Sequence, residues 1–342
     1  MIKFSKFFAL IVLSTIIIGG AIIPDTISLA TSNRGISLKS VHKTTAKLKV
    51  GQYIRLGKYN DESIIWRCVD IDSKGTLMLA DRILSIKPFD AKGAHKYSYG
   101  SSRSDDPVGA RLLWGSNLWQ TSNMRSWLNS TAIAGKVRWL DGCPPKKDNV
   151  FHGVNAYENE KGFLAVGNFT AYERRLIKTV TLKSLLNKVD FKKLKYGGSE
   201  YHFWNPNISR VIQNFDKAYY HNLTEKVFLL DIKQIKQVYL NKSKLGSKYY
   251  IGKPTQKAVD KSEFKADELN ASKYWSSWLR TPDADPRDVD PDDSRYVKSD
   301  GSVRDHSAYY QDVGIRPAFY INLNKLIIKS GIGSLGNPFV LG

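Results

Sequence analysis

The chain has 342 residues and a mass of 38.7 kDa, which is enough for one large domain or two ordinary ones. Hydrophobic residues make up 42% and charged residues 25% of the sequence, a globular composition that excludes a disordered chain. The formal net charge of +20 favours polyanionic partners such as nucleic acid, anionic lipid or the phosphate-rich polymers of a bacterial wall.

The first thirty residues have the pattern of a secretory signal. Lys3 and Lys6 precede an apolar run over 7–23. Ser28 and Ala30 then place small residues at the positions that a signal peptidase reads. An uncleaved membrane anchor is the alternative, because the apolar run approaches the length of a membrane span.

Pro24 ends the apolar run and favours cleavage over an anchor. We therefore predict a signal peptide over 1–30, a polar tether over 31–47, and no stable membrane span after cleavage. The mature protein stays strongly basic and is expected to be secreted or associated with the cell wall. An exported protein rarely meets chromosomal DNA, so no nucleic-acid partner is expected.

A meander of three strands is predicted at the start of the folded part, which begins near Leu48. The ranges 50–56, 62–71 and 76–81 are rich in apolar and β-branched residues, and 62–71 shows the alternation of a strand. Short connections make consecutive strands antiparallel neighbours. The stretch 92–117 follows, and we predict it to be an irregular binding loop or flap.

Three helices are predicted from their capping residues. The first helix is capped by Thr121 or Ser122. The second begins with a capping box of Thr170 and Glu173, and the third with a capping box of Asp231 and Gln234. Further strands are predicted over 179–182, 226–230, 274–281 and 313–323, and the segment 325–341 is expected to pack as an edge.

The predicted fold is therefore α+β, with short antiparallel strands, two or three helices and long loops. We expect a single domain over 48–342. It contains a Lys-rich insertion around 183–270 that we place at the surface.

The two cysteines, Cys68 and Cys143, form a disulfide or stay separate. Cys68 lies in a strand-like run with Ile64 and Trp66 at the same parity, which favours a core position. Four tryptophans between 114 and 139 suggest a carbohydrate-stacking surface, although packing in the core is the favoured interpretation for each.

Motifs for several chemistries are absent or fail. The glycines of 331–336 match a dinucleotide-binding fingerprint, but only six residues follow them and Pro338 blocks the required helix. The sequence has no G-x-S-x-G or H-E-x-x-H motif, and its six histidines are scattered singly. A non-catalytic protein is therefore favoured.

The densest chemical signal is an acidic loop over 283–293. Calcium would neutralise its carboxylates, because the ion takes about six to eight oxygen ligands in irregular loops. Aligned with an EF-hand loop that begins at Asp288, the sequence has Asp293 at the position that requires glycine and Ser299 at the position that requires glutamate. The loop is therefore not an EF-hand. The alternatives are a solvated loop or pairing with Arg280, Arg295, Arg304 and Arg316. The candidate metal ligands are Asp283, Asp285, Asp288 and Asp290, and Ca²⁺ is the only cofactor considered.

Aromatic and basic residues around this loop are the candidate ligand-binding residues: Trp278, Arg280, Tyr296, Arg304, Tyr309 and Tyr310. Arg280 and Arg316 lie among large apolar residues, where a guanidinium must be paired. We expect both to clamp nearby aspartates; in the alternative, Arg280 reaches an anionic ligand.

A series of motifs in order resembles a family of secreted or surface proteins of Gram-positive bacteria known only as a domain of unknown function. The motifs are VGQYIRLGKY, IIWRCVDID, LMLADRIL, SNMRSWLN, EKVFLLDIKQI, WLRTP, YVKSDGSV and GIRPAFYIN. The resemblance extends from about Leu48 to the C-terminus. In most members the residue at Cys68 is aliphatic, and the acidic loop is a shorter turn.

The closing W-L-R and G-x-R-P-A pattern is also distantly similar to the C-type-lectin-like fold of formylglycine-generating enzymes. That similarity implies a lectin-like fold. It does not imply the oxidase chemistry, because this chain has no cysteine pair near its C-terminus.

Two functions follow as hypotheses. The first is an extracellular recognition module that binds a glycan, wall polymer or surface protein through the loops of 282–310. The alternative is an extracellular hydrolase that uses two aspartates of 283–293 with separated pKa values.

Overall fold

The structure, a computed structural model, describes residues 47–93, 107–187, 190, 208–210, 217–283 and 290–342. The predicted signal peptide and most of the predicted tether lie outside the described residues. All described residues belong to one structural unit, Lys43–Gly342. Sheets and helices are both present, so the prediction of a mixed α+β fold made mostly of strands is confirmed.

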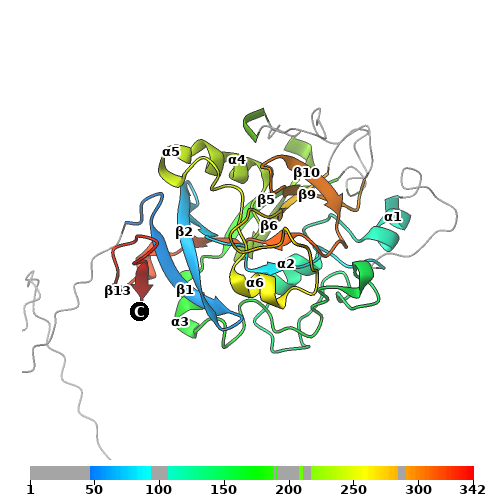
Figure 1. Ribbon diagram of the computed structural model, residues 1–342, viewed down its shortest axis with the longest axis horizontal. Helices are drawn as coiled ribbons and strands as arrows, with labels where there is room; N and C mark the ends of the chain where they lie inside the picture. The colour runs from blue at the N-terminus through cyan, green and yellow to red at the C-terminus, as the bar shows by residue number, and fades with distance from the viewer. Residues whose placement is uncertain (1–46, 94–106, 188–189, 191–207, 211–216, 284–289) are drawn as a thin grey trace, which may run out of the picture. The chain divides into compact units, whose positions relative to one another are not determined.

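The centre of the largest sheet is the predicted meander. β1 (Tyr53–Tyr59), β2 (Glu62–Asp72) and β3 (Gly75–Ala80) pair antiparallel in sequence order, within three residues of the predicted bounds. The sheet order is β13-β14-β1-β2-β3-β12-β7, with β7 at Val227–Phe228, β12 at Ala318–Ile321, β13 at Ile328–Ser330 and β14 at Phe339–Leu341. The C-terminal segment therefore forms an edge, as predicted, beside β1 (Figure 1).

A second sheet carries the residues predicted to bind a ligand. Its order is β10-β9-β8-β11-β4, with β4 at Ser85–Ile86, β8 at Ser277–Pro282, β9 at Asp293–Val297, β10 at Val303–Ser307 and β11 at Gly314–Ile315. β8, β9 and β10 are antiparallel neighbours. Gly301 turns the chain between β9 and β10 at a φ of 92°, a conformation that favours glycine.

The prediction of one strand over 313–323 is wrong, because the chain passes from one sheet to the other within it. β11 belongs to the five-stranded sheet and β12 to the seven-stranded sheet. Pro317 lies between them and has no N–H for a ladder, while its carbonyl accepts a hydrogen bond from Ala80 at 2.9 Å. Arg316 is thereby placed at the junction of the two sheets.

The described residues of the predicted insertion 183–270 pack into the fold, while 188–189, 191–207 and 211–216 lie outside the described residues. β5 (Val180–Leu185) and β6 (Tyr220–Glu225) form a two-stranded sheet, and Tyr219, Leu230 and Ile251 are buried. Its helices are α4 (Ile232–Leu240), α5 (Lys242–Leu245) and α6 (Gln256–Lys261). Most of its described lysines are exposed and alternate with buried apolar residues, which is why composition alone suggested a surface segment.

The capping predictions are confirmed. Ser122 caps α2 (Asn123–Leu128), and Thr170 forms a capping box with Glu173 at α3 (Ala171–Leu176). Asp231 forms the same box with Gln234 at α4. α1 (Pro107–Trp114), in contrast, lies inside the stretch predicted to be irregular. The short 3-10 helices are η1 (Phe151–Gly153), η3 (Ile208–Arg210), η4 (Lys217–Tyr219) and η5 (Leu323–Lys325).

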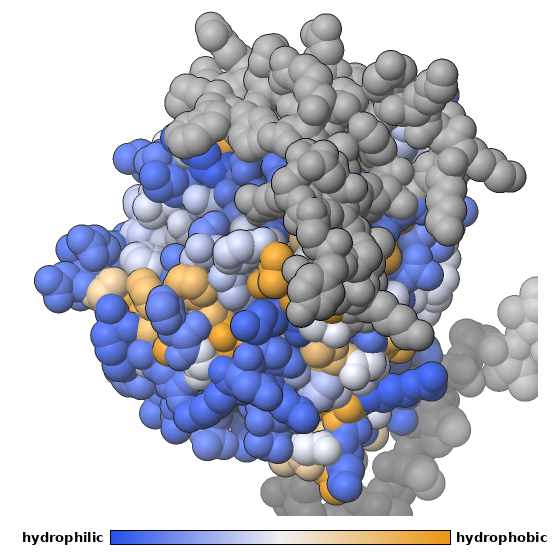
Figure 2. Space-filling view, turned by 90° about the vertical axis from the view of Figure 1, so that its right-hand side faces the viewer, coloured by the Kyte–Doolittle hydropathy of each residue, from blue (hydrophilic) through white to orange (hydrophobic). Residues whose placement is uncertain are grey.

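Large aromatic side chains fill the core between these elements. Three tryptophans have no exposed surface: Trp66, Trp119 and Trp127. For Trp119 and Trp127 this agrees with the prediction that they pack in the core. Cys68 is fully buried and, like Cys143, is a free thiol, so the two are not bridged. Figure 2 shows that hydrophilic residues cover most of one face, with hydrophobic residues in smaller groups between them.

Among helices of the described residues, none has the length and apolarity needed to cross a membrane.

A buried carboxyl group, that of Asp90, and a half-buried one, that of Asp141, lie at the start of α2. The Asp90 carboxylate accepts hydrogen bonds from the backbone N–H groups of Asn123 at 2.8 Å and Ser116 at 3.0 Å. Asp141 accepts from the Asn123 side-chain amide at 3.1 Å. Burial, and then the charge of Asp141, hold the pKa of Asp90 well above its usual value, and burial raises the pKa of Asp141.

A carboxyl group whose pKa is higher in the folded than in the unfolded protein stabilises the fold fully at pH values below its unfolded pKa. This contribution is lost as the pH rises through its folded pKa. We therefore expect the free energy of unfolding to fall between pH 5 and pH 8. Asp141→Asn should reduce that fall, because it removes the charge beside Asp90. Urea unfolding at the two pH values measures this, with exposed Asp267→Asn as the control. An equal fall in Asp141→Asn and the control would contradict the expectation.

Candidate ligand-binding site

The β9–β10 hairpin aligns several of the predicted ligand-binding residues. In the sheet register Tyr296 lies opposite Trp278 on one side and opposite Arg304 on the other. Residues directly opposite each other point to the same face, and so does His306, two positions beyond Arg304. One face of the sheet therefore gathers three aromatic rings and a guanidinium.

The rings continue beyond the hairpin as a stack. His306 and Tyr310 are stacked with ring centroids 3.9 Å apart, and Tyr310 lies 4.3 Å from Phe151. Tyr296 lies 6.0 Å from His306. We call Phe151, Tyr296, His306 and Tyr310 the aromatic site.

The aromatic site is partly open to solvent above a fixed base. Its four members are half-buried, and the His306 side chain is 30% exposed. Trp278 beneath them is only 1% exposed, and its indole donates a hydrogen bond to the Lys87 carbonyl at 3.0 Å. The rings are therefore held by the core while part of their surface remains exposed to solvent.

Polar groups surround these rings. The Nε2 atom of His306 lies 3.7 Å from a carboxylate oxygen of Asp312, and Arg304 is half-buried beside Tyr296. Burial, followed by the charges of Asp312 and Asp305, raises the pKa of Tyr296 to about 12. Its hydroxyl therefore stays protonated at neutral pH and can donate a hydrogen bond. Such a surface can stack against the flat apolar face of a ligand and hydrogen-bond to its polar edge.

The structure places three of the six predicted ligand-binding residues in the interior, the aromatic Trp278 and Tyr309 and the basic Arg280. Trp278 is the base of the aromatic site, and Tyr309, at 6% exposure, packs against Trp114 at 5.3 Å. The two residues support the aromatic site instead of facing a ligand.

Arg280 makes internal contacts as well. It is 2% exposed and forms an ion pair with Asp231 at 2.6 Å, with further hydrogen bonds to Gln234 and the Lys183 carbonyl. The expectation that Arg280 clamps an aspartate is correct, but the aspartate is the cap of α4 and not a member of the acidic loop.

The described part of the acidic loop is turned inward. Asp283 is 1% exposed and pairs with Arg295 at 2.5 Å, and Asp290 is 7% exposed. The Asn117 side chain fixes the loop by donating to the carbonyls of Asp290 and Asp293. Asp285 and Asp288 lie outside the described residues. Within the described residues, no group of three or more potential metal ligands is present. For Asp283 the alternative of arginine pairing is therefore the one observed.

A separate cavity of about 630 Å³ lies between β1, β14 and the residues 166–174. Its only carboxylate is Glu173, whose oxygens accept hydrogen bonds from the backbone N–H groups of Thr170 and Gly57. This glutamate holds α3 in place, so we give the cavity no chemical role.

Comparison with protein families gives one family model that matches most of the chain. The model of a family described as a domain of unknown function, DUF6273, matches residues 74–323, more than half of the chain. The chain belongs to this family. The DUF6273 match includes every member of the aromatic site, while β1, β2 and the C-terminal β13 and β14 lie outside it. The prediction that the chain belongs to a family known only as a domain of unknown function is confirmed, over a shorter range than the expected one from about Leu48 to the C-terminus. Neither the curated proteins nor the solved structures give a match.

Sequence reasoning missed two members of the aromatic site in this DUF6273 domain. His306 was grouped with the scattered histidines, although its spacing of two from Arg304 in a strand places both on one face. Phe151 comes from η1 and gave no local signal, because it meets Tyr310 only through the tertiary fold.

Proposed function

We propose that this protein is an exported, non-catalytic recognition module that binds a glycan on the aromatic site. The observation that carries the proposal is the stack of half-buried rings from Tyr296 to Phe151, supported from below by Trp278. Sugar rings present flat C–H faces that pack on aromatic rings, while their hydroxyls require hydrogen-bond partners. Arg304, Asp312 and the Tyr296 hydroxyl supply such partners at the edge of the rings.

The sequence supports the place of action. The basic start, apolar run and small-residue exit of the first thirty residues are typical of exported proteins. The wall of a Gram-positive bacterium would offer glycans directly to such a protein, and a basic chain is attracted to anionic wall polymers. The distant similarity to a C-type-lectin-like fold agrees with a binding role.

The hydrolase alternative has less support. It requires two aspartates of the acidic loop with separated pKa values in an open cleft. Asp283 is buried against Arg295, and its charge is already neutralised there. We therefore favour binding without catalysis.

The proposal is tested with the chain from residue 31 onward on a glycan array and on purified wall polysaccharide. Tyr310→Ala removes the ring between His306 and Phe151 and should weaken glycan binding about tenfold or more, the effect of losing a central aromatic contact. Tyr172→Ala is the matched control, because Tyr172 is a half-buried tyrosine beside η5. Absence of glycan binding by the unmodified protein, or equal losses in both variants, would refute the proposal.

A further inference from the structure

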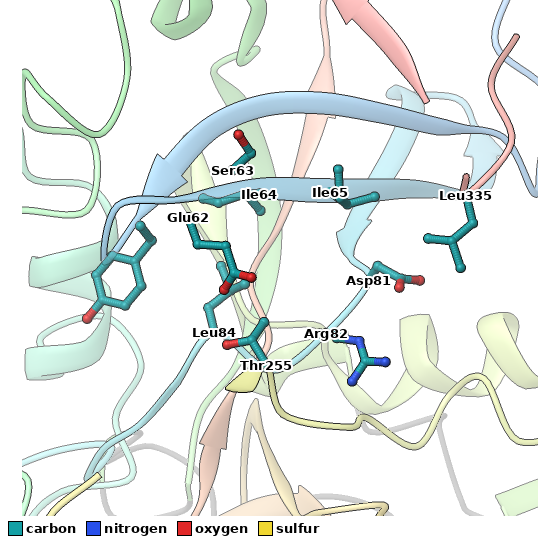
Figure 3. Close-up of a pocket in the computed structure, with 10 residues that line it drawn as sticks. Glu62, Ser63, Ile64, Ile65, Asp81, Arg82, Leu84, Thr255 and Leu335 are labelled. Atoms are coloured by element: carbon teal, nitrogen blue, oxygen red, sulfur yellow. The ribbon is translucent and has the colours of Figure 1, made fainter. Parts of the chain in front are cut away.

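A second site lies away from the aromatic site, at the junction of the two large sheets. A cavity of about 400 Å³ is bordered by the end of β3, the loop 245–253, Tyr274 and Arg316. Asp81 and Arg82 also line an adjoining cavity of about 200 Å³, so the two spaces share a wall. Figure 3 shows Glu62, Asp81 and Arg82 on the same side of β2, facing this adjoining space. The volume of the larger cavity is in the range of small-molecule sites.

Arg316 is a buried cation without a carboxylate partner in the described chain. It is 4% exposed, and its guanidinium donates four hydrogen bonds, all to backbone carbonyls: Ala80 at 2.9 Å, Asp81 at 3.2 Å, Tyr249 at 2.8 Å and Tyr250 at 3.4 Å. The guanidinium has one N–H more than these bonds use. The expectation that Arg316 clamps an aspartate is therefore wrong, because the junction at Pro317 turns it toward carbonyls.

A buried charge is costly unless an opposite charge or a ligand balances it. The carbonyl dipoles orient the Arg316 guanidinium and compensate part of this cost, but they do not cancel the net charge. A site that holds an arginine rigidly by its backbone contacts, at the wall of a cavity, is prepared for an anionic ligand.

A second arginine strengthens the positive field. Arg67 also donates only to carbonyls in the described chain, those of Gly51, Lys244 and Leu245. Its guanidinium lies 4.5 Å from the ring centre of Tyr249, and that of Arg316 lies 4.6 Å from the same ring. The two guanidinium groups therefore share one aromatic ring, which fixes both of them.

The rim of the cavity adds mobile cations. Lys253 lies 4.8 Å and Lys248 5.9 Å from the ring centre of Tyr274. With Arg82 and Arg316, four basic side chains line the larger cavity, against the single carboxylate of Asp81. Low-dielectric walls focus such a field and raise the local concentration of anions.

We propose that this cavity binds a phosphate ester, with the phosphoryl group beside Arg316 and the two rim lysines. Guanidinium forks and ammonium groups are the side chains that proteins use for phosphate. The half-buried Tyr274 ring offers a face for the organic part of the ester. The ester comes from a small phosphorylated molecule or from a segment of a phosphodiester polymer, and the two have the same recognition chemistry at this site.

Calorimetric titration at low salt tests the proposal with two probes, glycerol 3-phosphate and a poly(glycerol phosphate) chain. The variant carries Lys248→Gln and Lys253→Gln, exchanges at the rim that leave the core intact. We expect binding to weaken about tenfold or more, as for the loss of charged hydrogen-bond partners. The control carries Lys257→Gln and Lys261→Gln, two exposed lysines of α6 outside the cavity lining.

Each outcome decides the proposal. Binding of glycerol 3-phosphate that the rim variant loses identifies a small ester as sufficient, and binding of the polymer alone, lost in the same variant, identifies a polymer segment. Failure of both probes to bind, or equal binding by rim variant and control, overturns the proposal. Arg316→Lys keeps the charge but not the planar fork and should also weaken binding, provided that its circular dichroism shows a folded protein. Tyr310→Ala should leave phosphate-ester binding unchanged, which separates this inference from the glycan site.

Discussion

Replacing Arg295 by alanine is expected to lower the free energy of unfolding by about 3–5 kcal/mol at neutral pH. The Arg295 side chain has no exposed surface and pairs with Asp283 at 2.5 Å and with Asp305 at 3.0 Å. Both of these carboxylates are largely buried, so the variant leaves at least one negative charge in the interior without its cation.

Urea unfolding at neutral pH measures this effect. Arg138→Ala, at an exposed position, serves as the control and should change the free energy of unfolding by less than about 0.5 kcal/mol. If Arg295→Ala unfolds at the same urea concentration as the control, the acidic loop is not fixed by this ion pair.

The fate of the acidic loop shows what a sequence can and cannot predict about charge. The concentration of aspartates predicted that something must neutralise them, and for Asp283 the structure shows Arg295, one of the arginines considered. The partner of each charge depends on which strands become neighbours. Arg295 lies opposite Asp305 in the β9–β10 ladder, whereas Arg280 faces the cap of α4, a contact between segments 49 residues apart.

Rules that use only neighbouring residues predicted the strands and helices that such residues determine. The β1–β3 meander follows from alternation and short turns, and both capping boxes follow from residues three positions apart. The rules failed at 313–323, where apolar residues suggested one strand and Pro317 directs the chain into a second sheet. They also failed for α1, because the Gly, Ser and charged residues of 92–117 indicated an irregular loop and masked the short apolar segment PVGARLLW within it.

The site was predictable in part: Tyr296 and Tyr310 were among the candidate residues, whereas His306 of the same hairpin was missed. Tyr296 and Arg304 lie opposite each other in neighbouring strands, and Tyr309 and Tyr310 follow directly. The cavity at Arg316 was not predictable, because its lining comes from four separate segments of the chain. Only the isolation of an arginine among apolar residues drew attention to it.

The two proposed sites have a physical connection. The Tyr250 hydroxyl donates to the Gly301 carbonyl at 3.2 Å, so the loop 245–253 that borders the phosphate-ester cavity also holds the turn of the β9–β10 hairpin. A side chain at position 301 would overlap this hydroxyl, since a Cβ atom there would lie 2.3 Å from it. Glycine at this turn therefore allows the two segments to touch.

Trp278→Ala should destabilise the protein and impair the aromatic site together. Loss of this buried ring is expected to lower the free energy of unfolding by about 3–5 kcal/mol, the range for truncation of a large core side chain. The ring centre of Trp278 lies 6.1 Å from Tyr296 and 6.3 Å from His306. Its removal leaves both rings without support, so glycan binding should weaken as well.

Trp127→Ala separates the two effects. Trp127 is equally buried and donates to the Lys161 carbonyl, but its ring packs against Tyr59, Tyr157 and Phe163, away from the aromatic site. It should lose a similar amount of stability and keep its glycan affinity when binding is measured at a temperature where both variants are folded. Equal affinities in the two variants would show that the aromatic site does not depend on its buried base. Trp278→Phe should recover most of the binding, because a phenyl ring still supports His306 although it cannot donate to the Lys87 carbonyl.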